Sequence, residues 1–550
     1  MPRLLLLLAL LGALPTLRAQ PEIVPAEHPV YAWLHAQRVA GRLSEYPHEA
    51  LPLGRAQVQR LLDSLDARHD RLDAVGRYWL GEFRRELFEP PGSVESVLGG
   101  GGVRLPRGRD TEKFLYHRQG SEWRVALSAI GRVQARYADL DSTSYHGVAL
   151  VPEGVLQGNY RRLVGFYSGT FDGQQFGGDT RVLQSDPELA PLYYIGRQEV
   201  PPGSFDRSTA SLRVAGRAFS AEISHARLRY GASFDQPLVM GTGADYFSFL
   251  RLGLDTRVVQ YHFVHGALGD RSFNPLDSGF VLVGPERYLA LHRIAVNASR
   301  RITLAFSEWV VYGLRGPELA YLNPLNPFKT AEHALWDRDN ALFALEAVVR
   351  PLDGVEAYGT FLADDLNFSE LGRDTYGNKW AAQAGLGTSL ERLIPGALGF
   401  VEYTRINPFV YTHRFFLEGS FYNSYQHNGF GLGHPLGPNA DQVAGGLSVW
   451  LPGRVRARAV GRYVRRGESF VDENGQLVNV GGDIRDGRQP PFEEQTNVFL
   501  RGERFEGPGI TLEVTWEPFR GAALRLYGDY QDWDHAPSAL FLRSEVVIAL

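Results

Sequence analysis

The chain has 550 residues, a formal net charge of −5 and no cysteine. The missing cysteines exclude disulfide bonds and thiolate metal ligands, and the mild acidity argues against a nucleic-acid partner.

Residues 1–19 match a secretory signal peptide. Arg3 provides the positive start, residues 4–14 form an apolar stretch, and Ala19 is the small residue expected before a cleavage site. The apolar stretch is too short to cross a bilayer as a helix, which needs about 20 residues. We therefore expect an exported protein.

Residues 20–98 carry the apolar period of helices. Apolar residues recur about every three to four positions, which is the helical period, in two segments: Val58, Leu61, Leu62 and Leu65, and then Leu72, Val75, Trp79, Phe83 and Leu87. A shorter helix is predicted around Leu34. Three such helices can bury their apolar faces against one another, so this segment is predicted to be a small N-terminal helical domain.

Residues 99–111 are predicted to be a linker. Glycine fills positions 99–102, and Pro106 and Gly108 follow. No predicted strand precedes this glycine run and no predicted helix follows it, so it lacks the context of a phosphate-binding loop.

From Trp123 onward, short runs of the sequence alternate apolar and polar residues. In the first run, one parity is apolar and the other is charged or polar: Trp123, Val125, Leu127, Val133 and Tyr137 against Arg124, Arg132, Gln134 and Arg136. Successive side chains of a strand point to opposite faces, so this run has an apolar face and a polar face. A wall between lipid and water requires this pattern. Residues 112–550 are therefore predicted to be mainly β, as an outer-membrane antiparallel β-barrel of about 16–18 strands.

Four stretches between the candidate strands are too long for hairpin turns. In outer-membrane barrels the long loops face outward and the short turns face the periplasm, so we expect the helical domain on the periplasmic side or at the barrel mouth. Such a protein would be a monomer in the bacterial outer membrane, with outer-membrane lipid and the barrel-insertion machinery as partners. The four stretches are residues 184–208, 314–339, 406–440 and 465–495.

Two groups of polar residues are candidates for ligand binding. Two Asn-Pro steps in the second long stretch prevent regular structure and favour turns. An ordered loop or plug there could present amide and carboxylate groups to a sugar or a cation, but an ordinary loop capping the barrel would use the same residues. Acidic residues at the end of a later strand could bind carbohydrate hydroxyls or be solvated lumen charges. The candidates are Asn323, Asn326, Asp337, Asp339, Asn340, Asp364 and Asp365.

Local signatures of catalysis are missing from the sequence. It contains no HExxH, GxSxG or Walker motif, and its histidines do not have the spacing of metal ligands. We therefore expect no catalytic residue, no metal and no cofactor. A hydrolase with a dispersed triad embedded in the barrel remains a minor alternative.

Several short motifs carry a resemblance to a known family. Through them the chain resembles the Wzi-type capsule-assembly family, which includes RemB-like gliding proteins. The resemblance implies a barrel of about 18 strands with a periplasmic helical bundle. It also implies a lectin-like role that holds exported capsular polysaccharide at the cell surface. The motifs lie at residues 28–34, 41–43, 51–55, 323–328, 339–342 and 358–365.

The sequence thus favours a non-enzymatic barrel that attaches or organises surface polysaccharide. Aromatic rings can stack on the apolar faces of sugars, and Asn and Asp side chains can bind their hydroxyls. The main alternative is a passive or substrate-specific porin, which would share the barrel but keep an open, water-filled lumen.

Overall fold

The protein is described by a computed structural model. It covers residues 20–88, 94–96, 98, 112–140, 143–161, 163–193, 203–269, 271–273, 281–283, 286–366, 373, 375–414, 421–488 and 497–550. The predicted signal peptide and the predicted linker at residues 99–111 lie outside these ranges. None of the helices within them has the length and apolar character needed to cross a bilayer.

Three helices form an N-terminal helical domain over residues 20–88: α2 (Val30–Val39), α3 (Arg55–Asp66) and α4 (Ala74–Phe88). Their apolar faces meet in one core that includes Leu34, Leu62 and Phe83. This core continues into the barrel wall, where the ring of Trp79 packs edge-on against that of Trp450 at a centroid distance of 4.8 Å. The apolar faces predicted from the helical period therefore pack against one another and against the barrel wall.

Eighteen antiparallel strands close into a barrel, so the predicted fold class is confirmed. In chain order they are β5 (Trp123–Leu140), β6 (Thr143–Tyr160), β7 (Val164–Gly178), β8 (Ser204–Ala215), β9 (Phe219–Ala226), β11 (Phe247–Asp255), β12 (Val259–Leu268), β15 (Arg287–Asn297), β16 (Ile302–Gly313), β17 (Asn340–Leu352), β18 (Val355–Leu366), β19 (Asn378–Ser389), β20 (Ala397–Ile406), β23 (Ala440–Leu451), β24 (Val455–Glu468), β27 (Glu503–Phe519), β28 (Ala522–Gln531) and β29 (Ala539–Ala549).

The first and last strands of the barrel pair with each other. The β29–β5 register runs from Leu540 opposite Asp139 to Ala549 opposite Ile130. Beyond that point β4 (Tyr116–Gln119) pairs with residues 124–127 of β5 and takes the place of β29 along the same edge of β5. Closure leaves no unpaired edge between these strands, as a backbone in hydrocarbon requires.

Burial along the strands follows the predicted alternation. In β5, Val133 is 46% exposed while the neighbouring Gln134 is 4% exposed. In β29, Leu542 and Val546 are exposed while Glu545 between them is buried. Apolar side chains therefore cover the outside of the barrel and polar side chains line its interior, as in an outer-membrane wall.

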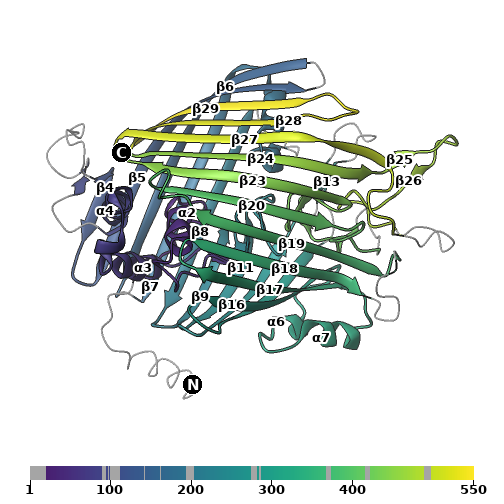
Figure 1. Cartoon of the computed structure of the whole chain (residues 1–550), viewed down its shortest axis with the longest axis horizontal. Helices are drawn as coiled ribbons and strands as arrows, with labels where there is room; N and C mark the ends of the chain where they lie inside the picture. The colour runs from purple at the N-terminus through teal and green to yellow at the C-terminus, as the bar shows by residue number, and fades with distance from the viewer. Residues whose placement is uncertain are drawn as a thin grey trace.

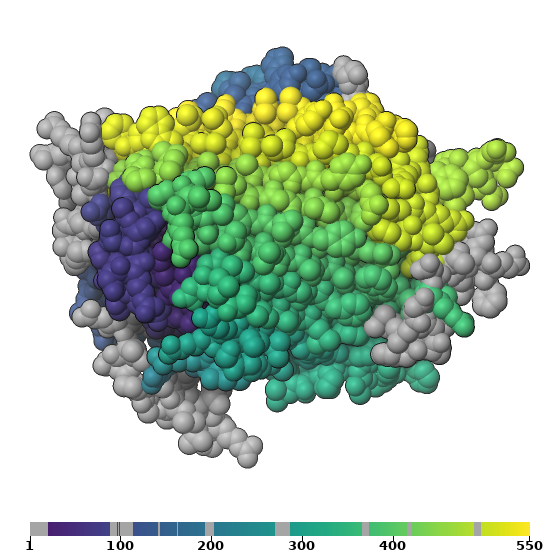
Figure 2. Space-filling model, in the orientation of Figure 1, coloured from purple at the N-terminus to yellow at the C-terminus, as the bar shows by residue number. Residues whose placement is uncertain are grey.

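The two ends of the barrel differ (Figure 1). Short turns join the strands at the end that holds the helical domain. In one of these turns Gly354 N donates a hydrogen bond to Val39 O of α2 at 2.9 Å. The long connections gather at the opposite end. The short-turn end is therefore the periplasmic one. Figure 2 shows the helical domain seated in this end of the barrel.

Shorter elements occupy the connections and the N-terminal region. They are β1 (Ala50–Leu51), η1 (His69–Arg71), β2 (Val94–Ser96), β3 (Glu112–Phe114), η2 (Thr180–Ser185), α5 (Ala190–Tyr193), β10 (Arg229–Tyr230), β13 (Arg271–Phe273), β14 (Val281–Val283), α6 (Leu319–Leu322), α7 (Phe328–Ala334), β21 (Gln426–His427), β22 (Phe430–Gly431), β25 (Phe470–Val471) and β26 (Leu477–Val478).

The alternation predicts opposite outcomes for two neighbouring substitutions in β27. Leu512→Arg places a charge on the lipid face and should lower the free energy of unfolding by about 2–4 kcal/mol. Glu513→Gln, on the lumen face, removes one partly exposed ion-pair partner and should cost less than about 1 kcal/mol. Urea unfolding in lipid vesicles measures both, and equal costs would contradict the assigned faces.

Candidate functional site: the filled lumen

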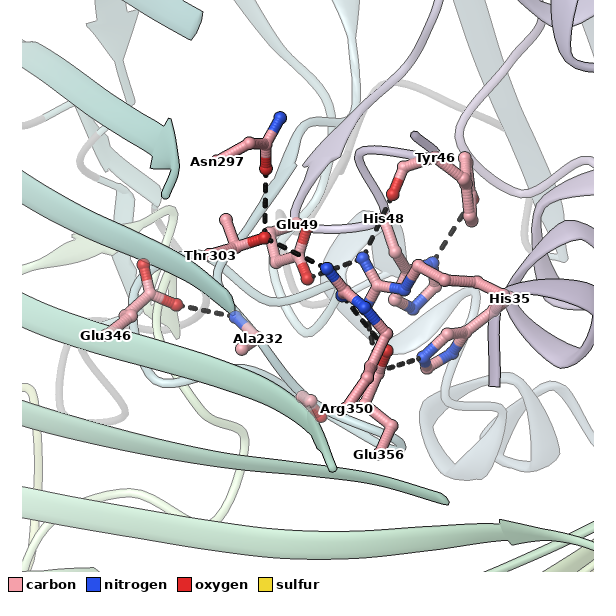
Figure 3. A network of polar contacts seen from close by, with 12 residues as sticks. His35, Tyr46, His48, Glu49, Ala232, Asn297, Thr303, Glu346, Arg350 and Glu356 are labelled. Atoms are coloured by element: carbon pink, nitrogen blue, oxygen red, sulfur yellow. Dashed lines mark hydrogen bonds and ion pairs between the residues drawn. The ribbon is translucent and has the colours of Figure 1, made fainter. Parts of the chain in front are cut away.

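Arg38 of α2 lies at the centre of a buried ion network inside the barrel. Its guanidinium contacts Glu356 on the lumen face of β18 and Glu49 of the helical domain, both at 2.7 Å. His35 contacts the same Glu356 carboxylate at 2.8 Å. Figure 3 shows His35, Glu49 and Glu356 converging on one point between the domain and the wall. The network fastens the helical domain to the barrel.

Burial shifts the pKa values of His35 and Glu49, the two titratable groups that the helical domain contributes to this network beside Arg38. It lowers the pKa of His35, although the carboxylate of Glu356 opposes that shift. Burial raises the pKa of Glu49, but Arg38 and Arg293 together hold it below its ordinary value. A guanidinium with two carboxylates and a neutral imidazole is a charge arrangement that persists in a low-dielectric site only when every partner is present.

The connection between β9 and β11, residues 227–246, folds into the lumen and meets the helical domain there. Its β10 pairs with β1 of the domain, with Tyr230 opposite Ala50. Arg229 donates to the backbone oxygens of His48 at 3.2 Å and Ser233 at 3.1 Å. The domain and this loop therefore share a small sheet in the middle of the barrel.

The described residues of the connection between β20 and β23, 407–414 and 421–439, continue the filling toward the long-loop end. The hydroxyls of Tyr411 and Tyr425 donate to Leu238 O and Val239 O, both at 2.7 Å. Around them, lumen-facing side chains of the wall are fully buried, and they include Trp309, Leu342, Leu362 and Ala381. The lumen is thus filled on the side formed by β9 to β20.

A third connection also enters the barrel. Residues 179–193, with η2 and α5, pack Val182 and Leu183 against lumen-facing apolar residues of β5, β6 and β29. Asp186 accepts hydrogen bonds from Arg136 at 2.7 Å and from Arg543 at 2.8 Å. The described part of this loop is therefore anchored to both strands of the closing pair.

The remaining lumen wall, on β24, β27 and β28, is charged and reached by water. We call it the charged sector: Arg458, Arg462, Glu513, Arg525 and Asp529. Arg462 contacts Asp529 at 2.9 Å, and the side chains of Glu513 and Arg525 are 49% and 45% exposed. Guanidinium and carboxylate groups in this arrangement bind hydroxyls and charged groups of a ligand.

The helical domain closes the base of the charged sector. Glu82 of α4 accepts hydrogen bonds from Arg454 and Arg520 near the periplasmic ends of β24 and β27, both at 2.7 Å. The described residues contain no cluster of three or more side chains able to hold a metal ion.

Of the predicted site residues, Asp364 and Asp365 lie at the long-loop end of β18. Asp364 is buried and accepts a hydrogen bond from Tyr411 N at 2.6 Å. Asp365 contacts Lys379 at 2.7 Å. Asp364 thus holds the start of the β20–β23 connection in the lumen, and Asp365 pairs with Lys379, which donates to Thr412 O at 3.2 Å. Binding of a sugar by either residue stays a prediction.

The other five predicted residues belong to residues 314–339 or to the start of β17. Residues 314–339, which contain α6 and α7, are called the outer-wall segment because they fold over the outside of the barrel. Asn323 accepts a hydrogen bond from Leu325 N at 3.1 Å, and Asn326 donates to Ala320 O at 3.0 Å. Both amides therefore stabilise turns within the segment.

The three remaining candidates differ in exposure. Asp339 is buried and accepts hydrogen bonds from Arg315 and from the hydroxyl of Tyr321. Asn340 is buried and donates to Asn423 O at 3.1 Å, whereas Asp337 is exposed. Ligand binding by these three residues stays a prediction.

Sequence reasoning missed the residues at the centre of the lumen. Arg38 lies on a helix whose polar residues are buried as completely as its apolar ones. Glu356 lies on the lumen face of its strand, but no local pattern could name its partner because Arg38 is more than 300 positions away. A helix with an amphipathic sequence gives no sign that its polar face will also be enclosed.

The geometry defines the class of the protein: an outer-membrane β-barrel with a filled lumen. Among solved structures it is similar to Wzi of Escherichia coli, an outer-membrane protein involved in group 1 capsule assembly and described as a carbohydrate-binding β-barrel. The TM-score is 0.58 at 12% identity, over 96% of this chain and 99% of Wzi. The fold implied by the resemblance is therefore confirmed.

Other similar structures are porin-type barrels that match less of the chain. OprD of Pseudomonas aeruginosa has a TM-score of 0.41 at 9% identity, over 77% of this chain and 95% of its own. OccAB2 of Acinetobacter baumannii has a TM-score of 0.46 at 9% identity, over 78% and 98%. No protein-family model and no curated protein matches the sequence.

Removal of Arg38 should release the helical domain. Arg38→Met leaves the buried Glu49 without its ion-pair partner and leaves Glu356 with Arg350 as its remaining cation, which costs about 3–5 kcal/mol. We expect faster hydrogen exchange in α2 and a rise in single-channel current across planar bilayers. The matched control is Arg84→Met in α4, whose ion pairs are exposed and worth less than about 1 kcal/mol. Equal behaviour of the two variants would contradict a central role for Arg38.

Two lumen-loop histidines should make stability depend on pH. Burial lowers the pKa of His427 and of His434 to about 4. In each ring Nδ1 accepts a backbone hydrogen bond, from Gly269 N at 2.8 Å and from Leu436 N at 3.1 Å, so the folded state holds both rings neutral.

The unfolded chain binds protons at these rings below pH 6.5, so their stabilisation is complete above pH 6.5 and is lost as the pH falls toward 4. Each histidine should cost about 2 kcal/mol at pH 5. The measurement is the free energy of unfolding at pH 8 and pH 5. The double variant His427→Gln, His434→Gln should lose this part of the pH dependence, and an unchanged dependence would refute the assignment.

Proposed function

We propose that the protein attaches or organises exported capsular or surface polysaccharide at the outer face of the outer membrane, without catalysis. The observation that carries the proposal is the filled lumen. The helical domain enters from the periplasmic end. Residues 227–246, 407–414 and 421–439 enter from the other end and contact it or one another. A barrel of 18 strands built for free diffusion would keep its lumen open.

The chemistry of the charged sector supports a hydroxyl-rich ligand. Its arginine and carboxylate groups are paired but water-reached, so they can exchange water for sugar hydroxyls at low cost in desolvation. The fold likeness to Wzi also supports the proposal, because it includes the helical domain as well as the barrel.

Deletion of the gene tests the role in cells. Surface polysaccharide should be shed into the medium instead of staying attached, and a plasmid copy of the wild type should restore retention. The Arg84→Met variant should restore it equally, which controls for expression of a folded barrel. Unchanged retention in the deletion strain would count against the proposal.

Conductance separates the proposal from the porin alternative. The purified protein should give no steady current in planar bilayers, because residues 227–246, 407–414 and 421–439 occupy the lumen. A large, steady current would favour the porin. Release of product from lipid, peptide or glycan substrates would favour the barrel-embedded hydrolase instead.

A further inference from the structure

The outer wall of the barrel is covered in one place by the protein itself. On the lipid face of β16, Leu304 and Phe306 are exposed, whereas Val310 and Tyr312 on the same face are 0% exposed. The latter two belong to a cluster with Tyr321 and Phe328 of the outer-wall segment. Figure 1 shows α6 and α7 outside the barrel, beside β16 and β17. The cover is therefore added to the lipid face and does not cap the mouth.

A polar pair lies beneath this cover. Glu308 of β16 and His292 of β15 face outward and contact each other at 2.8 Å. The Glu308 carboxylate also accepts hydrogen bonds from Phe328 N at 3.0 Å and Lys329 N at 2.7 Å, at the start of α7. The ring of Phe328 stacks on that of His292 at 4.4 Å.

A carboxylate facing hydrocarbon without partners costs several kcal/mol, so the wall needs this cover. The hydrogen bonds to α7 supply the partners that lipid cannot. The outer-wall segment is thus a permanent part of the membrane-facing surface.

The position of the cover follows from the strand geometry. A strand tilted by about 40° advances roughly 2.5 Å per residue along the barrel axis, so Glu308 lies about 15 Å and Tyr312 about 25 Å from the periplasmic end of β16 at Ile302. The apolar band of an outer-membrane barrel is about 25 Å tall. The covered area therefore coincides with the outer half of the band.

The side of the segment that faces away from the wall carries large apolar side chains. Leu319 is 79% exposed, Leu325 83% and Trp336 90%. They are next to the lipid-facing wall of β16 and β17 and continue its apolar surface, while Lys329 and Asp337 on the same segment are exposed and polar. Mixed apolar and charged residues with a tryptophan are typical of segments at a membrane interface.

We propose that the outer-wall segment lies in the outer leaflet of the membrane, with Leu319, Leu325 and Trp336 in contact with lipid acyl chains. The barrel then presents two kinds of surface to the outer leaflet: bare strands around most of the wall, and a helical layer over β12, β15, β16 and β17. This inference is independent of what the lumen or the loops bind.

Spin labelling tests the proposal cleanly because the chain has no cysteine of its own. Leu325→Cys and Trp336→Cys each receive a nitroxide label in phosphatidylcholine vesicles. Two matched controls are Leu304→Cys on the bare lipid face and Val471→Cys on the long-loop end, which are both exposed. Heat-modifiable migration on gels first establishes that every variant is folded.

The ratio of collisions with oxygen to collisions with a water-soluble nickel complex reports lipid exposure. At positions 325 and 336 it should approach the value at 304 and exceed the value at 471 several-fold. A ratio equal to that at 471 would place the segment in water and overturn the proposal. Dipolar broadening between labels would instead reveal a second copy of the chain on this surface, which would also overturn it.

Discussion

A backbone in hydrocarbon must satisfy its own hydrogen bonds, and this constraint shapes the whole molecule. Pairing of β29 with β5 removes the last free edge. The resulting ring of 18 strands encloses a wide interior. The other elements of the structure line or fill that interior. The polar parity of each strand faces it, and three connections and a helical domain enter it.

The filling is assembled from parts that are distant in the chain. Residues 50–51 and 229–230 form one small sheet, and Arg38 reaches Glu356 across the interface between domain and wall. Each contact joins the helical domain to a strand or a loop of the barrel. The domain is therefore held by groups that are too buried to release without leaving charge unpaired.

The alternation of residues was sufficient to predict the barrel and its two faces, because period two is a property of single strands. In β6, Pro152 and several glycines interrupt the alternating pattern. Whether a long loop caps the mouth, enters the lumen or covers the outside depends on contacts such as Tyr411 with Leu238, which no local pattern encodes.

Glu308 makes the outer-wall segment a condition for the stability of the wall beneath it. A carboxylate that faces hydrocarbon without partners costs several kcal/mol, and its partners Phe328 N and Lys329 N lie about one loop further along the chain. We therefore expect the hairpin of β15 and β16 to be stable against lipid only when the outer-wall segment is docked on it.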